Sequence, residues 1–230
     1  MTKPRVLATA IGGAGGACAA LAFAAPAPLR WLLIWTALAC ALVACAYLAN
    51  RPGVYGKRAG RLSWWRGLPV LPYLIAYRIA TAVRDARRRY AAWNEVAPGL
   101  YVGARIDAAR LPPGTELVVD LTSEVNEPED LRRHPGYRGL PVLDGSVPPD
   151  EERFLELVYE MAAAPGGVYV HCISGRGRAP TAAAAVLIAR GVADGPAAAF
   201  ELLRKGRPVV KPTRADVSFV ERIAARLASA

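Results

Sequence analysis

HCISGRGR, residues 171–178, places a cysteine and an arginine at the two ends of a short loop that contains two glycines. The preceding residues 167–170 read as a short buried strand, and residues 180–189 favour a helix with proline in its first turn. The loop therefore joins a strand to a helix N-terminus. Backbone N–H groups of such a loop, with the positive end of the helix dipole, favour a bound anion and a thiolate.

The residues of this loop supply the groups that a bound phosphate needs. Glycine lets the backbone adopt positive φ and approach a ligand closely. The guanidinium of Arg178 can donate two parallel hydrogen bonds to phosphoryl oxygens, and Cys172 is the predicted nucleophile. The predicted phosphate-binding residues between them are Ile173, Ser174, Gly175, Arg176 and Gly177.

Residues 171–178 resemble the signature of the cysteine-dependent protein-tyrosine and dual-specificity phosphatases, which is His-Cys, five residues, then Arg. The resemblance extends over about residues 99–230. It implies hydrolysis of phosphomonoesters through a phosphocysteine intermediate, with no cofactor, and a loop-orienting role for His171. The few cysteines and histidines show no metal-ligand spacing, so no metal is expected. An ordinary buried cysteine in a turn is the alternative interpretation of Cys172.

Asp144 is the predicted general acid, because it lies about as far upstream of the cysteine as the family places that residue. It would protonate the leaving oxygen and later accept a proton from the attacking water. The alternative is a structural aspartate in a turn before Gly145. Asp150, Glu151 and Glu152 are further candidates, although acidic residues also favour the first turn of the helix expected there.

Ala179 departs from the family pattern, which usually has Ser or Thr directly after the signature arginine. That hydroxyl helps the thiolate to leave when the phosphoenzyme is hydrolysed, so we expect the phosphocysteine form to accumulate. The hydroxyls of Thr181 and Ser174 are possible substitutes. A pseudophosphatase that binds phosphate without turnover is therefore one alternative function.

The expected fold is an α/β, three-layer phosphatase domain with a short, mostly parallel sheet, preceded by a two-helix transmembrane hairpin. The expected strands lie at 99–103, 116–122, 137–142 and 167–170, and the expected helices near 151–164, 180–190, 195–205 and 213–228. Three segments result: residues 1–50 form the hairpin, 51–98 a basic and aromatic juxtamembrane segment, and 99–230 the phosphatase domain.

Two uncharged apolar runs, Val6–Ala25 and Trp31–Ala49, each have the length that a helix needs to cross the hydrocarbon core of a membrane. Basic residues precede the first run and follow the second, so the positive-inside rule predicts a multi-pass protein of the cell membrane with its phosphatase domain in the cytoplasm. Gly12, Gly13, Gly15 and Gly16 offer a small-residue face to the second helix, and Gly12 and Gly16 have the spacing of close helix packing. A cleaved signal peptide is the alternative interpretation of the first run.

Charge is divided along the chain, with 13 Lys and Arg against 2 Asp and Glu in residues 1–99, and 16 against 17 in the remainder, giving the net charge of +10. The basic excess flanks the apolar runs, which favours a membrane and argues against nucleic acid as partner. Trp64 and Trp65 suit a headgroup boundary, and a basic helix over Leu74–Trp93 would bind anionic lipid. The alternative is a solvated helix that packs on the phosphatase domain.

The first expectation for the substrate is a phosphoprotein, carrying phosphotyrosine and also phosphoserine or phosphothreonine. The alternative is an anionic phospholipid, phosphatidylglycerophosphate or a phosphoinositide, because the loop with Arg176 is similar to those of lipid-directed family members. Four basic residues lie where the family places secondary substrate contacts, although a charged helix boundary explains them equally well: Lys205, Arg207, Lys211 and Arg214.

Overall fold

The computed structural model describes residues 3–229, which divide into two compact units. The first unit extends to Arg88 and includes the short segment Ser123–Asn126. The second comprises Arg89–Thr122 and the chain from Glu127 onward, so it contains all of the phosphatase signature.

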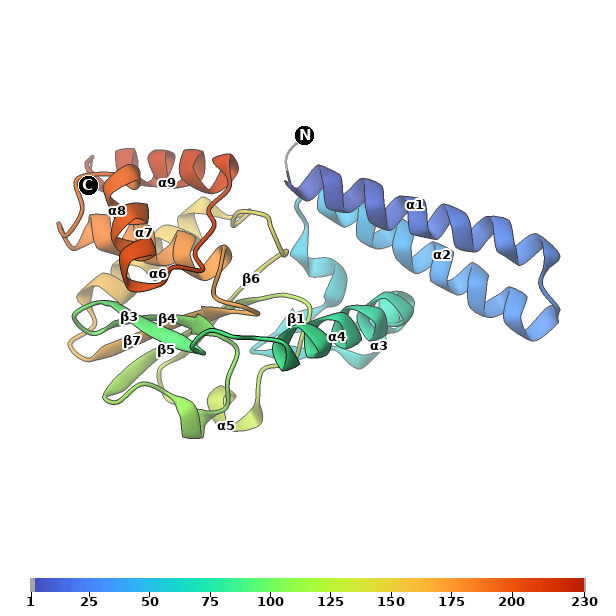
Figure 1. Ribbon diagram of the computed structural model, residues 1–230, viewed down its shortest axis with the longest axis horizontal. Helices are drawn as coiled ribbons and strands as arrows, with labels where there is room; N and C mark the ends of the chain where they lie inside the picture. The colour runs from blue at the N-terminus through green and yellow to red at the C-terminus, as the bar shows by residue number, and fades with distance from the viewer. Residues whose placement is uncertain (1–2, 230) are drawn as a thin grey trace. The chain divides into compact units, whose positions relative to one another are not determined.

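A five-stranded sheet forms the centre of the second unit (Figure 1). Its strand order is β3-β4-β7-β5-β6, in which β3 pairs antiparallel with β4 and the other neighbours pair in parallel. The central strand β7 is hydrogen-bonded on both sides, and its residues are almost all buried, as is typical of a parallel sheet covered on both faces. The strands are β3 (Trp93–Ala97), β4 (Leu100–Ala104), β5 (Thr115–Thr122), β6 (Tyr137–Val142) and β7 (Gly167–Cys172).

Helices cover one face of this sheet, and shorter elements cover the other (Figure 1). Alternate residues of β7 point to opposite faces, so Val168 and Val170 join the core beneath the helices while Tyr169 packs on the other side with Val118 and Leu131. This confirms the mostly parallel, three-layer α/β fold. The large helices are α6 (Glu151–Ala163), α7 (Arg178–Ala189), α8 (Pro196–Gly206) and α9 (Arg214–Leu227); the shorter elements are η3 (Ala108–Arg110) and α5 (Glu129–Arg132).

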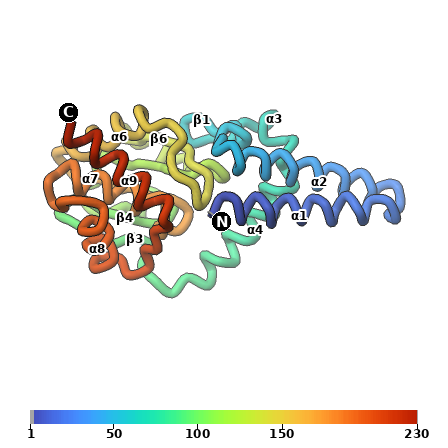
Figure 2. The backbone as a smooth tube through the Cα atoms, turned by 90° about the horizontal axis from the view of Figure 1, so that it is seen from above, coloured from blue at the N-terminus to red at the C-terminus, as the bar shows by residue number. Residues whose placement is uncertain are grey.

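In the first unit, α1 (Lys3–Ala24) and α2 (Ala27–Leu48) pack against one another as a hairpin, which Figure 2 shows from above. Both are long and apolar enough to cross a membrane. Among the glycines of α1, Gly15 lies closest to α2, because an added Cβ would lie 2.8 Å from Cys40 Cβ. A Cβ at Gly12 would lie 3.8 Å from Ala44 Cβ. The prediction of a glycine face toward α2 is thus confirmed at Gly12 and Gly15 and wrong at Gly13 and Gly16, where a Cβ would meet no atom within 4 Å.

The rest of the first unit consists of short elements and one longer helix: η1 (Pro52–Tyr55), β1 (Lys57–Arg58), β2 (Arg61–Leu62), α3 (Trp64–Gly67), η2 (Leu68–Val70) and α4 (Leu71–Ala86). The predicted helix over Leu74–Trp93 was wrong at both ends. Helix α4 begins earlier because Pro72 lies at its first positions, where proline is tolerated. Trp93 instead starts β3, which turns back onto β4 through Gly99 at φ +69°.

Candidate active site

Cys172 is the last residue of the central strand β7, and its side chain is buried in the core on the helix side of the sheet. The chain then passes through residues 173–177 and enters α7 at Arg178. The predicted strand, loop and helix are thus present, and the loop lies at the carboxyl end of the central strand. Ligands bind at this edge in parallel α/β sheets.

The carbonyl groups of this loop all accept hydrogen bonds from the surrounding chain. With the carbonyls held by the scaffold, the amide N–H groups of the loop can face its centre and bind an anion. The donors are the amide of Arg105 to Ile173 O (3.4 Å), Arg207 Nη2 to Ser174 O (3.2 Å), Arg207 Nε to Gly175 O (2.9 Å), the amide of Lys211 to Arg176 O (3.0 Å) and the amide of Thr181 to Gly177 O (2.9 Å).

Gly175 is required by two separate features of the loop. Its φ of +64° lies in the left-handed region that side chains disfavour. A Cβ at this position would also lie 2.6 Å from the carbonyl carbon and oxygen of Gly103 and 2.9 Å from Arg207 Nη2. By contrast, a Cβ at Gly177 would meet no atom within 4 Å.

Arg207 is fully buried directly after α8, and its guanidinium joins the loop to the segment that precedes β3. Besides the two loop carbonyls, the guanidinium lies over the ring of Tyr90, 5.6 Å from its centroid. It also donates hydrogen bonds to Ala91 O (3.2 Å), Ala92 O (3.4 Å) and Asn94 Oδ1 (2.6 Å). Arg207 does lie at the C-terminal boundary of α8, as one of the two interpretations predicted. The other interpretation, a direct substrate contact, was wrong, because the side chain is fully buried.

The signature arginine, Arg178, is buried beneath the carboxyl ends of β5 and β6. Its Nη1 donates to Val142 O at 2.5 Å and to Leu121 O at 3.3 Å. Its Nη2 lies 3.5 Å from Asp144 Oδ1. The structure thus brings the predicted phosphate ligand and the predicted general acid together, on two segments 34 positions apart in the sequence.

Asp144 lies in a tight turn after β6. The amide of Ser146 donates to Leu143 O at 3.0 Å, and Gly145 has φ +75°, as the third residue of a type II turn requires. The Asp144 side chain is one-third exposed, so it lies between the buried arginine and solvent. The turn interpretation and the catalytic interpretation of Asp144 are therefore compatible.

The three alternative acids all have structural partners around α6. Asp150 caps the helix by accepting from the amide of Arg153 at 3.1 Å. Glu151 accepts hydrogen bonds from Arg222, and Glu152 pairs with Arg226, both on α9. These contacts account for the acidic residues without a catalytic role.

Ala179 is fully buried in the first turn of α7. The nearby hydroxyl of Thr181 lies 3.0 Å from Gly177 O and 3.2 Å from Asp216 Oδ1, so it is engaged by the helix N-terminus and by α9. Asp216 also forms the capping box of α9 with Thr213. Thr181 is thus bound to structural groups rather than held for the intermediate.

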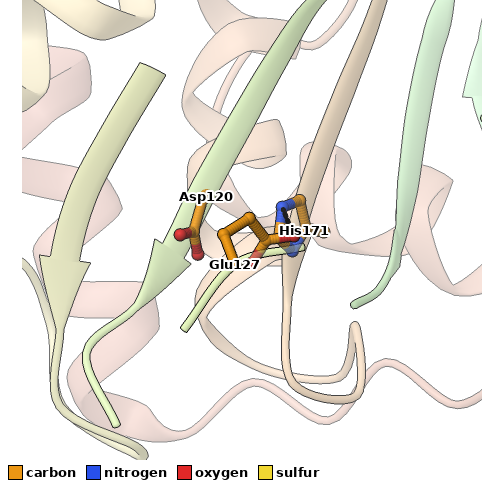
Figure 3. Close-up of side chains that lie close together, drawn as sticks. All are labelled: Asp120, Glu127 and His171. Atoms are coloured by element: carbon orange, nitrogen blue, oxygen red, sulfur yellow. Dashed lines mark ion pairs between the residues drawn. The ribbon is translucent and has the colours of Figure 1, made fainter. Parts of the chain in front are cut away.

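His171 is fully buried beside a network of charged groups that sequence reasoning did not predict (Figure 3). Glu127 Oε1 lies 3.6 Å from His171 Nε2, and Glu127 Oε2 lies 3.5 Å from Arg105 Nε. The imidazole also stacks on Tyr169, with ring centroids 5.5 Å apart. Glu127 lies in an irregular loop several residues after β5, so no local pattern in the sequence pairs it with His171.

Asp120 completes this network opposite His171 in the sheet register. It accepts hydrogen bonds from the Tyr137 hydroxyl (2.8 Å) and from the amide and hydroxyl of Thr122 (2.8 and 2.7 Å). Burial and the neighbouring carboxylate raise the pKa of Tyr137, so it stays a neutral donor. Ligand atoms of Asp120, Glu127 and His171 lie within 4.8 Å of one another and could hold a metal, but these contacts already account for them as a buried charge network.

Lys205, Lys211 and Arg214 complete the set of four basic residues expected to contact substrate or to mark a helix boundary, and all three are exposed. Lys205 Nζ pairs with Glu201 on the same helix at 2.8 Å. Lys211 follows α8 closely, and its amide holds the loop carbonyl of Arg176. Arg214 is the first residue of α9.

Residues 106–224 match the family described as Swiss Army Knife protein, DSP-PTPase phosphatase domain. Solved structures with a similar fold include PTPMT1 in complex with PI(5)P (18% identity, TM-score 0.51) and a mutant form of Tk-PTP (20% identity, TM-score 0.51), each covering 60% of this chain and 98% of the other. Human DUSP28 is 22% identical, with a TM-score of 0.49 and coverage of 60% and 97%. No curated protein sequence matches the chain.

Proposed function

Because this chain belongs to the DSP-PTPase phosphatase family, we propose that it hydrolyses phosphomonoesters through a phosphocysteine formed on Cys172. The observation that carries this proposal is the loop at residues 173–177, whose carbonyls are all held by the surrounding chain. Such a loop presents amide N–H groups and the positive end of α7 to a phosphoryl group, next to a cysteine.

In the first step, the Cys172 thiolate attacks phosphorus and the bond from phosphorus to the leaving oxygen breaks. Asp144 gives its proton to that oxygen, so the leaving group departs as a neutral alcohol or phenol. Arg178 and the loop amides bind the three equatorial oxygens, where negative charge is spread in the transition state. Arg178 lies 3.5 Å from Asp144, which supports this division of roles.

In the second step, water attacks the phosphocysteine and Asp144, now a carboxylate, accepts its proton. The bond from phosphorus to sulfur breaks, and the Cys172 thiolate and inorganic phosphate are released. With Ala179 in place of a hydroxyl donor, and Thr181 engaged elsewhere, this second step limits the rate. His171 takes no proton in either step, and its proposed role is to orient the loop.

The first proposed substrate class is phosphotyrosine in proteins, with phosphoserine and phosphothreonine, in keeping with the dual-specificity relatives of the family. A second class, anionic phospholipid, is favoured by the apolar helices α1 and α2 in the same chain. We propose that these helices anchor the protein in the cell membrane with the catalytic domain in the cytoplasm, because basic residues flank both. The relative PTPMT1 was solved with a phosphoinositide, PI(5)P.

The test is phosphate release by the full-length protein in anionic vesicles, comparing a phosphotyrosine peptide with phosphatidylglycerophosphate. Release from the peptide that is lost in Cys172→Ser supports the first class, and Cys172-dependent release from the lipid alone supports the second. Binding of either substrate without release identifies the pseudophosphatase and overturns the proposed hydrolysis.

A further inference from the structure

One face of α4 is apolar along its whole length and exposed to solvent. Residues four positions apart lie on the same side of a helix, so Ile75, Ile79 and Val83 form a row. Their exposed fractions are 50%, 61% and 47%. Four exposed alanines flank this row: Ala76, Ala80, Ala82 and Ala86. We call the row and these alanines the outer face of α4. Exposed Arg78, three positions after Ile75, lies at its edge, and Arg87 follows its C-terminal end.

The opposite side of α4 is packed within its own unit. Leu74 is buried, and Tyr73 stacks on Tyr55 with ring centroids 6.2 Å apart. Tyr55 is itself fully buried, and it lies close enough to Tyr47 in the last turn of α2 for that residue to help raise its pKa. These contacts fix the start of α4 beside the C-terminal end of α2. The outer face therefore has no packing role inside the first unit.

Two exposed tryptophans precede α4 in the sequence. Trp64 and Trp65 in α3 are 82% and 57% exposed, and Leu68 between them and α4 is half exposed. Large apolar side chains exposed together mark an interaction surface rather than ordinary solvent-facing surface. Tryptophan in particular favours the boundary between lipid headgroups and acyl chains.

The charge of this segment identifies the partner as an anionic bilayer surface. Residues 50–92 contain ten Lys and Arg and a single acidic residue, Asp85. Exposed arginines of α3 and α4 and of the residue that follows α4 include Arg66, Arg78 and Arg87. Arg66 also lies over the Trp65 ring, 4.8 Å from its centroid, so cation and aromatic ring are presented together. An apolar helix face bordered by arginines is the pattern of a helix that lies in a membrane interface.

We propose that α3 and the outer face of α4 lie in the headgroup region of an anionic bilayer, at the end where α2 leaves it. This inference rests on the proposed membrane anchoring by α1 and α2. It adds a second, peripheral contact that binds lipid through its own apolar and basic groups, in the segment that leads directly into the catalytic unit.

The test uses the full-length chain with its native cysteines replaced and a single new cysteine that carries an environment-sensitive fluorophore. The labelled variants are Ile79→Cys on the outer face, Asp85→Cys on another side of the same helix, and Leu38→Cys, whose native side chain is exposed on α2. Each is reconstituted in vesicles of phosphatidylcholine with and without phosphatidylglycerol. A nitroxide-labelled phospholipid then serves as quencher, because it reports contact with lipid and not with protein.

We expect strong quenching at positions 38 and 79 and weak quenching at 85, with position 79 quenched more in the anionic vesicles. Quenching at 38 without quenching at 79 overturns the inference and leaves the anchoring intact. An apolar emission at 79 that the lipid does not quench also overturns it, because the face is then covered by the catalytic unit. Absence of quenching at 38 contradicts the anchoring itself and the inference with it.

Discussion

Arg178 Nη2 lies 3.5 Å from Asp144 Oδ1, which joins the first residue of α7 to the turn after β6. The arginine is buried and the aspartate is one-third exposed. The guanidinium can thus bind phosphoryl oxygens while the carboxyl group remains accessible to a leaving group and to water. Because the two groups have different exposure, the proposed roles of Arg178 and Asp144 can be tested by separate substitutions.

Replacement of Asp144 should have an effect that depends on the leaving group. We expect Asp144→Asn to lower kcat by about 10²–10³-fold for esters with a poor leaving group, because no proton is donated in the transition state. An aryl phosphate with a good leaving group should lose much less. The measurement is kcat for both substrate types, with Asp150→Asn as control because Asp150 caps α6. Equal losses for both substrates would exclude Asp144 as the acid.

Replacement of Arg178 by lysine keeps the charge and removes the planar fork. We expect Arg178→Lys to lower kcat/KM by about 10²–10³-fold, as loss of a transition-state hydrogen-bond donor does. The loss should appear in affinity for vanadate as well, since that ion resembles the pentacoordinate transition state. Arg176→Lys, on the same loop, is the control and should retain most of the activity. Wild-type vanadate affinity in Arg178→Lys would contradict the assignment.

The two glycines of the loop provide a matched pair. Gly175→Ala places a Cβ 2.6 Å from the Gly103 carbonyl at a φ of +64°, so we expect a loss of about 2 kcal/mol in the free energy of unfolding. Phosphate affinity should fall with it, because the loop must shift. A Cβ at Gly177 would meet no atom within 4 Å, but the φ of −130° and ψ of −81° lie outside the regions that residues with a side chain favour. Thermal unfolding and phosphate binding should therefore show a smaller loss in Gly177→Ala than in Gly175→Ala, and an equal loss in both variants would refute this account of the loop.

Arg207 should act as a positioning residue for the loop. Lysine cannot reproduce the hydrogen bonds that the guanidinium makes to Ser174, Gly175 and Asn94, so Arg207→Lys should bind vanadate about tenfold more weakly. Lys205→Ala, at an exposed position on α8, is the control. Vanadate affinity and melting temperature are measured for the same variants, so that an effect on the loop can be told apart from a general loss of stability. A lower melting temperature with unchanged vanadate affinity would assign Arg207 a structural role alone.

The residue after the signature arginine should control the second step. We expect the wild type to release a burst of the alcohol or phenol product, followed by slower turnover. Ala179 provides no hydroxyl to assist release of the thiolate in the second step. Ala179→Ser should shrink the burst and raise the steady-state rate. Ala182→Ser, also buried in α7, is the control for adding a hydroxyl to this helix. A linear time course in the wild type would show that the second step is not limiting.

The sequence predicted those parts of the fold that local pattern determines. The helix expected near 213–228 is present at Arg214–Leu227, and the strand at 137–142, which the resemblance to the phosphatase family implied, is present at Tyr137–Val142. Strand β3 was missed because Trp93–Ala97 is an edge strand whose pairing with β4 carries little local signal. The sequence predicted a glycine face of α1 toward α2 but not which of the four glycines makes the contact, because glycines so close together are compatible with several packings.

The candidate site was predicted to the extent that its residues belong to one motif. Cys172, Arg178 and the loop lie within eight positions, whereas Arg207 and Glu127 act through contacts with residues distant in the sequence. The residues that flank Arg207 and Glu127 in the sequence do not indicate that these side chains are buried, and charged residues are mostly exposed. Only the three-dimensional arrangement shows that both are enclosed, Arg207 against the loop at residues 173–177 and Glu127 against His171.

The most direct measurement of the central claim is mass spectrometry of the full-length protein quenched in acid during turnover. The account predicts one phosphoryl group on the peptide that contains Cys172, formed faster than it is lost, and absent from Cys172→Ser. Phosphate on a different residue, or phosphate release that continues in Cys172→Ser, would contradict the phosphocysteine mechanism.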